Sequence, residues 1–144
     1  MKRLLGTSND VSLTMMRLVL GVVFFAHGAQ KMLGWFGGYG FHGTMGFLEH
    51  TGLPASVALL VICTEFFGGL GLIVGLLTRI ASLGIAGLMI GAIFRVHLAN
   101  GFFMNWAGNQ KGEGIEYHLL VLAIAATLLL RGAGAFSADH ALSK

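Results

Sequence analysis

A few ionisable side chains interrupt the long apolar stretches of this sequence, and their types and spacing could support chemistry. His27, Gln30 and Lys31 occur at positions i, i+3 and i+4, so on a helix they share one face. A charge inside hydrocarbon costs at least about 2.5 to 3.5 kcal/mol, so charges at such positions usually have a function. Imidazoles and carboxylates can also transfer protons near neutral pH.

More polar residues occur in the other apolar runs. Glu65 lies near the middle of the second run, Arg95 and His97 lie towards the end of the third, and Glu116 and His118 open the fourth. Arg95 continues a face of the third run that carries small residues, namely Gly84, Gly87 and Gly91. We therefore expect Arg95 to point into a helix bundle.

The composition indicates that lipid is the solvent around these residues. Of 144 residues, 56% are hydrophobic and 10% are charged, and the mean hydropathy is +0.81, whereas a soluble domain carries about 25% charged residues. A helix of about 20 apolar residues crosses the hydrocarbon core. The sequence predicts an all-α membrane protein, a single domain over residues 1–144 with four transmembrane helices at about 12–33, 54–77, 80–99 and 114–130.

The distribution of basic residues predicts the orientation. With four spans both termini lie on one side, together with six basic residues, Lys2, Arg3, Arg17, Arg79, Arg131 and Lys144. The other side has three, Lys31, Arg95 and Lys111. The positive-inside rule then puts both termini in the cytoplasm of a multi-pass inner-membrane protein, with the span-end arginines as simple anchors and Lys31 reaching towards the interface.

This orientation brings polar residues of different spans to one depth. His27, Arg95 and His118 fall in the outer half of the bilayer and Glu65 somewhat deeper, so we expect one polar pocket that opens outward. The catalytic candidates are Glu65, His27 and His118. The substrate-binding candidates are Arg95, His97, Gln30, Lys31 and Glu116. The alternative is that Glu65 and Arg95 form an ion pair that only locks the helices together.

Other site chemistries have weaker support in the sequence. Three histidines at one depth could bind haem or a metal, but no HxxxH, ExxH or CxxCH spacing is present, and we predict no metal site. The only cysteine, Cys63, lies in an apolar run. The net charge of +3 is spread over single residues, which argues against nucleic acid as a partner.

Glycine spacing predicts where helices pack closely. Gly71 and Gly75 form a GxxxG motif in the second run, and the glycines of the third run share a face. These faces are candidates for contacts with other subunits or with a second copy of the chain.

A series of short motifs resembles the DoxX family over nearly the whole chain. In order they are Arg17-x-x-x-Gly21, Gly28-x-x-Lys31, Gly52-x-Pro54, Glu65-x-x-Gly68-Gly69, Gly75-x-x-Thr78-Arg79, Met89-x-Gly91-Ala92, Glu116-Tyr117 and Gly132-x-Gly134-x-x-Ser137-x-Asp139. The resemblance implies a four-helix inner-membrane protein, related to subunits of membrane quinone oxidoreductases, that acts beside other membrane or soluble redox subunits.

Three functions follow as hypotheses. In the first, the pocket binds a quinone headgroup between titratable groups and apolar walls, for which Phe24, Phe25, Phe66, Phe67 and Phe94 are available. In the second, the protein is a non-catalytic adaptor or assembly factor that binds its neighbours through the glycine faces. Transport ranks third, since four helices form a narrow bundle and no inverted repeat is visible.

Overall fold

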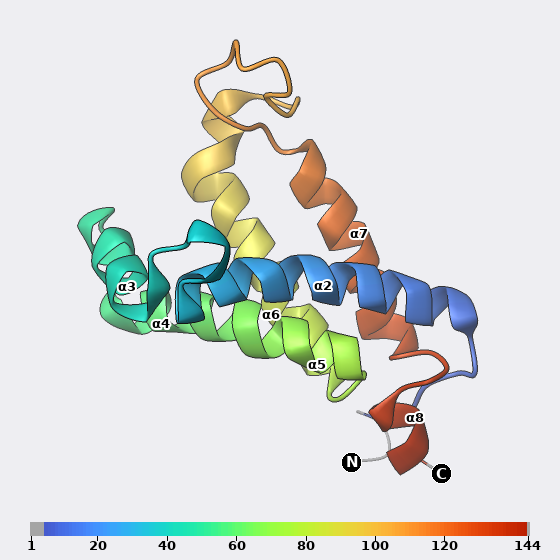
Figure 1. The fold of residues 1–144 in the computed structure, drawn as a ribbon. Coiled ribbons are helices and arrows are strands. Elements are labelled where there is room, and N and C mark those ends of the chain that lie inside the picture. Colours follow the sequence, from blue (N-terminus) through green and yellow to red (C-terminus); the bar gives the residue numbers. More distant parts are fainter. Residues whose placement is uncertain (1–4, 144) are drawn as a thin grey trace.

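The computed structural model describes residues 5–143, and over this range the chain is helical with no β-strand. The predicted all-α class is therefore confirmed. Lys2, Arg3 and Lys144, which contribute to the charge count above, lie outside the described residues. The first and last described segments lie near each other at one end of the bundle, called here the terminal end (Figure 1).

Three helices within residues 5–143 are long and apolar enough to cross a membrane. The first is α2 (Val11–Leu33). The second, Ala55–Val74, joins α4 (Ala55–Cys63), the π-helical segment η2 (Thr64–Gly68) and α5 (Gly69–Val74). The third, Thr78–Asn100, joins α6 (Thr78–Ala92), the π-helical segment η3 (Ile93–His97) and η4 (Leu98–Asn100). The fourth predicted span corresponds to α7 (Glu116–Arg131), a shorter helix of 16 residues.

Local sequence explains where these helices begin and end. The Asp10 carboxylate accepts hydrogen bonds from the backbone N–H groups of Ser12 and Leu13, which caps the start of α2. Gly34 ends α2 with φ of 73°, a left-handed conformation that glycine adopts without steric cost. The connection from α2 to α4 contains the short helix η1 (Trp35–Gly37) and a helix that the hydropathy pattern did not reveal, α3 (Gly40–His50).

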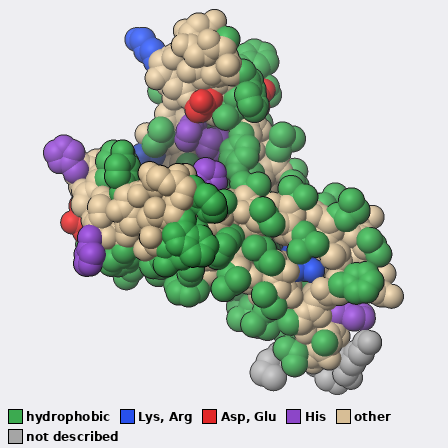
Figure 2. Space-filling view, viewed as in Figure 1, with side chains coloured by type: hydrophobic (Ala, Val, Ile, Leu, Met, Phe, Trp, Pro, Cys, Tyr) green, Lys and Arg blue, Asp and Glu red, His purple; other side chains and the backbone are tan. Residues whose placement is uncertain are grey.

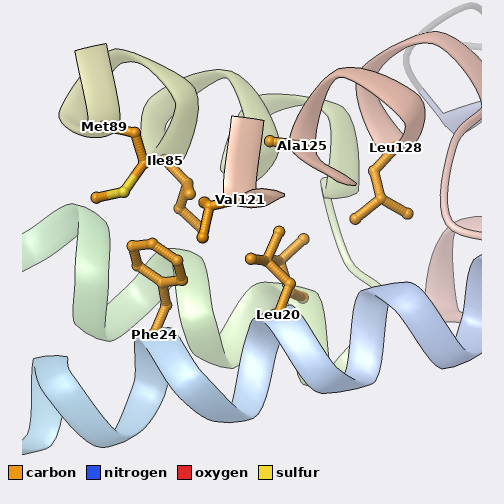
Figure 3. Close-up of a cluster of buried hydrophobic side chains, with 8 residues drawn as sticks. Leu20, Phe24, Ile85, Met89, Val121, Ala125 and Leu128 are labelled. Carbon is orange, nitrogen blue, oxygen red and sulfur yellow. The ribbon is translucent and has the colours of Figure 1, made fainter. Parts of the chain in front are cut away.

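The core lies where α2, α5, α6 and α7 meet, as Figure 3 shows. Its buried side chains are Leu20, Phe24, Leu72, Ile85, Met89, Val121, Ala125 and Leu128. Phe24 and Met89 lie towards the end of this core that faces away from the terminal end (Figures 1 and 3).

Close helix packing occurs on two glycines of α2 that the spacing pattern did not single out. A Cβ on Gly28 would lie 2.6 Å from the Glu65 carbonyl carbon, and one on Gly21 would lie 2.8 Å from the Ile73 nitrogen, so α2 packs with its backbone against η2 and α5. By contrast, Gly87 and Gly91 have no atom within 4 Å of such a Cβ. The predicted use of this α6 face inside the bundle holds only at Gly84, where a Cβ would lie 2.9 Å from Thr64 Cγ2 of η2, and is wrong at Gly87 and Gly91. Gly75, with φ of 74°, ends α5, and a Cβ there would meet Ser137 and lie 3.0 Å from Arg17 Cζ of α2.

The terminal end is closed by a buried arginine. Arg17 is 1% exposed, and its guanidinium donates to the carbonyls of Leu72, Ile73, Ala133 and Phe136. In the C-terminal helix α8 (Ala138–Leu142), the buried Asp139 carboxylate accepts from Leu77 N at 2.8 Å and Thr78 N at 2.9 Å, at the start of α6. Arg17 was expected to be a simple interface anchor. That interpretation is wrong, because its donors bind backbone carbonyls, of which those of Ile73, Ala133 and Phe136 have no other donor within residues 5–143. It is also wrong for Arg79, whose guanidinium donates to the carbonyls of Leu129, Leu130 and Gly6.

Candidate functional site

A cavity of about 500 Å³ lies at the end of the core that faces away from the terminal end. Its walls come from α2, η2, α6, η3, α7 and the 101–115 loop. They consist of Val23, Phe24, His27, Glu65, Met89, Ala92, His97, Met104, Trp106, Glu113, Tyr117 and His118. Figure 2 shows histidine side chains gathered in a recess below the 101–115 loop, beside hydrophobic side chains. Four of the predicted site residues, His27, Glu65, His97 and His118, therefore share one cavity.

Glu65 reaches the cavity from the π-helical segment η2 and is 8% exposed. Its Oε2 atom pairs with the Lys31 ammonium of α2, the one salt bridge found among residues 5–143. Pairing is what a carboxylate needs when it leaves water. The predicted ion pair between Glu65 and Arg95 is therefore wrong, as is the expectation that Lys31 extends to the interface. Lys31 turns inward but does not line the cavity.

Arg95 does not point into the bundle. Its side chain is exposed, and Nη2 donates to the Thr51 carbonyl oxygen at 2.7 Å, just after α3. The physical reason is that this face of α6 points out of the bundle before it reaches Arg95: Gly87 and Gly91, eight and four residues earlier, are themselves exposed. The extrapolation of the Gly84, Gly87 and Gly91 face to Arg95 assumed that the whole face is buried and failed for this reason, since only Gly84 meets another segment, at Thr64 of η2.

His97, in the segment η3, lies four residues after the buried Ile93 and contacts His118 of α7. Their ring centroids are 4.1 Å apart and their planes are tilted by 44°. His97 Nδ1 lies 2.8 Å from the Glu113 carbonyl oxygen, so Nδ1 is the donor and Nε2 stays free. His118 is 5% exposed, and within the described chain its Nδ1 atom has no hydrogen-bond partner. A buried polar atom without a partner is costly, so this nitrogen calls for a functional explanation, and the His118 side chain lines the cavity.

The remaining predicted residues lie around the cavity. His27 is exposed on α2 and lines the cavity wall. Gln30 lies outside it, with Nε2 at 3.5 Å from the Phe36 carbonyl oxygen. Glu116 also lies outside, and its Oε1 accepts from Met104 N at 2.8 Å. Glu116 therefore holds the 101–115 loop over the cavity.

Sequence reasoning missed several wall residues. Met104, Trp106 and Glu113 come from the loop, whose two ends pair through Gly114 N to Phe103 O at 3.1 Å and Ile115 N to Gly101 O at 3.2 Å. The available signal was the density of aromatic residues and glycine in a loop next to polar helix ends.

The aromatic walls also differ from the prediction. Tyr117 lines the cavity, but of the five phenylalanines expected there only Phe24 does. Phe25 instead packs on Phe66 with ring centroids 5.3 Å apart. Phe67 and Phe94 are exposed on the outside of the bundle.

The polar groups do not form a multidentate metal site. Among residues 5–143 no group of three or more His, Cys, Asp or Glu side chains is arranged to hold a metal ion. The donor set of two contacting imidazoles, a paired carboxylate and a phenol suits hydrogen bonding and proton transfer to an organic ligand.

The fold and cavity define a multi-pass helical membrane protein with one polar site inside an apolar bundle. A DoxX family profile matches residues 12–98, and the chain belongs to the DoxX family. It is 30% identical over 135 residues to "Putative oxidoreductase CatD" of Bacillus subtilis (strain 168), covering 94% of this chain and 90% of that protein.

A second relative supports the membrane assignment. The chain is 33% identical over 137 residues to "Inner membrane protein YqjF" of Escherichia coli (strain K12), covering 94% of this chain and 95% of that protein. No solved structure matches the chain. With its three long apolar helices, the chain is a multi-pass protein of the inner membrane.

Proposed function

We propose that this chain is the membrane subunit of a redox system and that its cavity binds a quinone headgroup. The observation that carries the proposal is the cavity itself, in which His27, Glu65, His97 and His118 face one space of about 500 Å³. Quinone reduction takes up protons together with electrons, so its site needs titratable groups shielded from lipid. The name of the Bacillus subtilis relative, an oxidoreductase, agrees with this class of reaction.

The residues present fit a quinone. Val23, Phe24, Met89 and Ala92 supply apolar walls for a flat ring. The His118 imidazole lines the cavity and can donate a hydrogen bond to a quinone carbonyl from whichever ring nitrogen carries the proton. The bound quinone would supply the electron-accepting chemistry, with electrons delivered by a partner redox subunit.

The protein side chains have separate roles in this proposal. His118 and His27 bind and orient the carbonyl oxygens, and His97 supports His118 through their ring contact. Glu65 carries protons between the cavity and the α2 side of the site, where Lys31 pairs with its charged form. Glu116 acts indirectly, because it positions the loop.

The proposal includes a topology of four spans with both termini in the cytoplasm. The fourth span is α7, and at about 1.5 Å per residue its 16 residues cover about 24 Å of the bilayer. Arg79 and Arg131 lie at the ends of helices on the terminal end, whereas Lys111 lies in the loop at the other. In a Cys63→Ser background, a membrane-impermeant maleimide should label Asn109→Cys in intact cells and Ser143→Cys only after lysis. The reverse pattern would reject this orientation.

Quinone binding can be tested with the two tryptophans of the chain, Trp35 and Trp106. In Trp35→Phe, the remaining Trp106 lines the cavity, so an added quinone should quench its fluorescence in a saturable way. Glu65→Gln should lower the quinone-dependent activity of the parent complex, and Glu49→Gln, on the exposed surface of α3, is the matched control. Absence of quenching, no quinone in an extract of purified protein and unchanged activity in Glu65→Gln would together reject the proposal. A Soret band in the visible spectrum would favour the haem alternative.

A second candidate is the non-catalytic adaptor, which one observation favours. Gly87 and Gly91 face open space on α6, where a helix of a neighbouring subunit or a second copy of the chain would approach closely. This function predicts that Gly87→Leu abolishes recovery of the partner, whereas Glu65→Gln combined with Arg95→Met is tolerated. Retained partner recovery in Gly87→Leu would exclude it.

A further inference from the structure

A second cavity, of about 400 Å³, adjoins the first along α2. It is lined by Val22, Val23, Ala26, His27, Gln30 and Phe36. Val23 and His27 line both cavities, so the two spaces meet along one turn of α2. We call the second cavity the α2 groove.

The α2 groove is apolar and open to the outside of the bundle. Val22 and Phe36 on its walls are exposed, and the Gln30 amide is directed to the Phe36 carbonyl oxygen at 3.5 Å. On a helix that spans a membrane, an exposed apolar face lies against acyl chains. The groove therefore links the polar cavity to the lipid phase, and none of the residues that line the groove is a Lys, Arg, Asp or Glu.

We propose that the α2 groove binds the isoprenoid chain of the same quinone whose headgroup occupies the larger cavity, with His27 at the junction of chain and ring. This inference rests on the proposed function. The shared wall of Val23 and His27 carries it, because an amphiphile with a flat polar ring and a long apolar chain needs a polar space and an apolar one that are continuous. A phospholipid acyl chain could also fill an apolar groove, but its occupancy would be unrelated to the ring site.

The inference predicts that blocking the groove affects only quinones that carry a chain. Ala26 and Val22 line the groove and not the larger cavity, so Ala26→Phe and Val22→Phe fill it without touching the headgroup site. Ala126→Phe, on the exposed face of α7, adds the same side chain outside both cavities and is the control. All three are made in the Trp35→Phe background so that Trp106 reports binding.

Two quinones with the same headgroup are titrated in the same detergent, one without a chain and one with a short isoprenoid chain. In Ala26→Phe and Val22→Phe, the affinity for the chain-bearing quinone should fall about tenfold relative to the control, because several methylene groups lose their buried site. The affinity for the chainless quinone should change less than about twofold, which also shows that the variants are folded. The affinity of each quinone is compared only between protein variants in the same detergent. Partition of that quinone into the micelle therefore changes all the compared affinities equally.

The outcomes separate this inference from the function on which it rests. If the chainless quinone binds every variant and the chain-bearing quinone loses no affinity in Ala26→Phe and Val22→Phe, the groove does not hold the chain, although the headgroup site stands. An equal loss for both quinones also overturns the inference. If neither quinone quenches Trp106 in the parent protein, the quinone site itself is rejected and the inference with it.

Discussion

The imidazole rings of His97 and His118 lie against each other, with centroids 4.1 Å apart, where η3 meets α7 beside the cavity. His97 is fixed by the Glu113 carbonyl, whereas the buried Nδ1 of His118 has no partner within the described chain. A protein keeps such an atom at a cost to its stability, and function is a usual reason for that cost.

His118→Phe should therefore stabilise the empty protein while removing ligand binding. The phenyl ring has a similar shape and no unpaired donor or acceptor, so we expect the free energy of unfolding in detergent to rise by about 1 to 3 kcal/mol. Quinone quenching of Trp106 should be lost. His140→Phe is the matched control, since His140 Nδ1 is also buried without a partner but lies in α8, away from the cavity. It should raise stability and leave quenching intact. A destabilised His118→Phe would mean that the imidazole is a structural group.

Lys31 and Glu65 should show strong coupling in a double-mutant cycle. Either Lys31→Met or Glu65→Gln leaves one charge without its partner, whereas the double variant leaves none. The double variant should thus be more stable than the sum of the single effects by about 0.5 to 3 kcal/mol, measured as the free energy of unfolding in detergent.

The control cycle combines Glu65→Gln with Arg95→Met. Arg95 donates to Thr51 and makes no salt bridge, so these two effects should add. Coupling between Glu65 and Arg95 in place of coupling between Glu65 and Lys31 would contradict the ion pair described above.

Arg17 should be the basic residue whose loss destabilises the protein most. Arg17→Met leaves the carbonyls of Ile73, Ala133 and Phe136 without a donor and removes one of the two donors to Leu72 O, and we expect a loss of about 3 to 5 kcal/mol in the free energy of unfolding. Arg17→Lys should recover only part of this loss, because an ammonium cannot reproduce the fork of guanidinium donors. Arg131→Met, at an exposed position, should change stability by about 0.5 kcal/mol or less. Similar stabilities for Arg17→Met and Arg131→Met would show that Arg17 is only an interface anchor.

Glycine-to-alanine substitutions should separate the packed helix face from the open one. A Cβ on Gly28 would meet the backbone of η2, so Gly28→Ala should cost about 1 to 3 kcal/mol. Gly87→Ala meets nothing within the described chain and removes a flexible residue from a helix, so it should stabilise the monomer by up to about 1 kcal/mol. Thermal unfolding in detergent measures both effects. Equal tolerance at the two positions would contradict the close contact between α2 and η2.

The length and hydropathy of the apolar runs were enough to predict an all-helical membrane protein and to locate its long helices within a few residues. Hydropathy works at this level because lipid offers no hydrogen bonds, so an apolar run must satisfy its own backbone as a helix. The helix α3 was missed because its residues are neither apolar enough for a span nor distinguished by a clear start signal; no side chain caps its first turn.

The sequence also predicted one pocket in the outer half of the bilayer, with His27 and His118 at one depth and Glu65 somewhat deeper, since helical rise fixes depth once the ends of a span are known. Which face of each helix is buried, and therefore which side chains point into the bundle, was decided only by the tertiary structure. Arg95 follows the exposed face of Gly87 and Gly91 and binds Thr51, whereas His97 follows the buried face of Met89 and Ile93 and lies against His118. The partner of Glu65 was likewise set by the close approach of α2 at Gly28, which brings Lys31 within reach of the carboxylate. Contacts between segments distant in sequence depend on backbone proximity and helix phase, and a one-dimensional pattern with an assumed period of 3.6 residues carries neither.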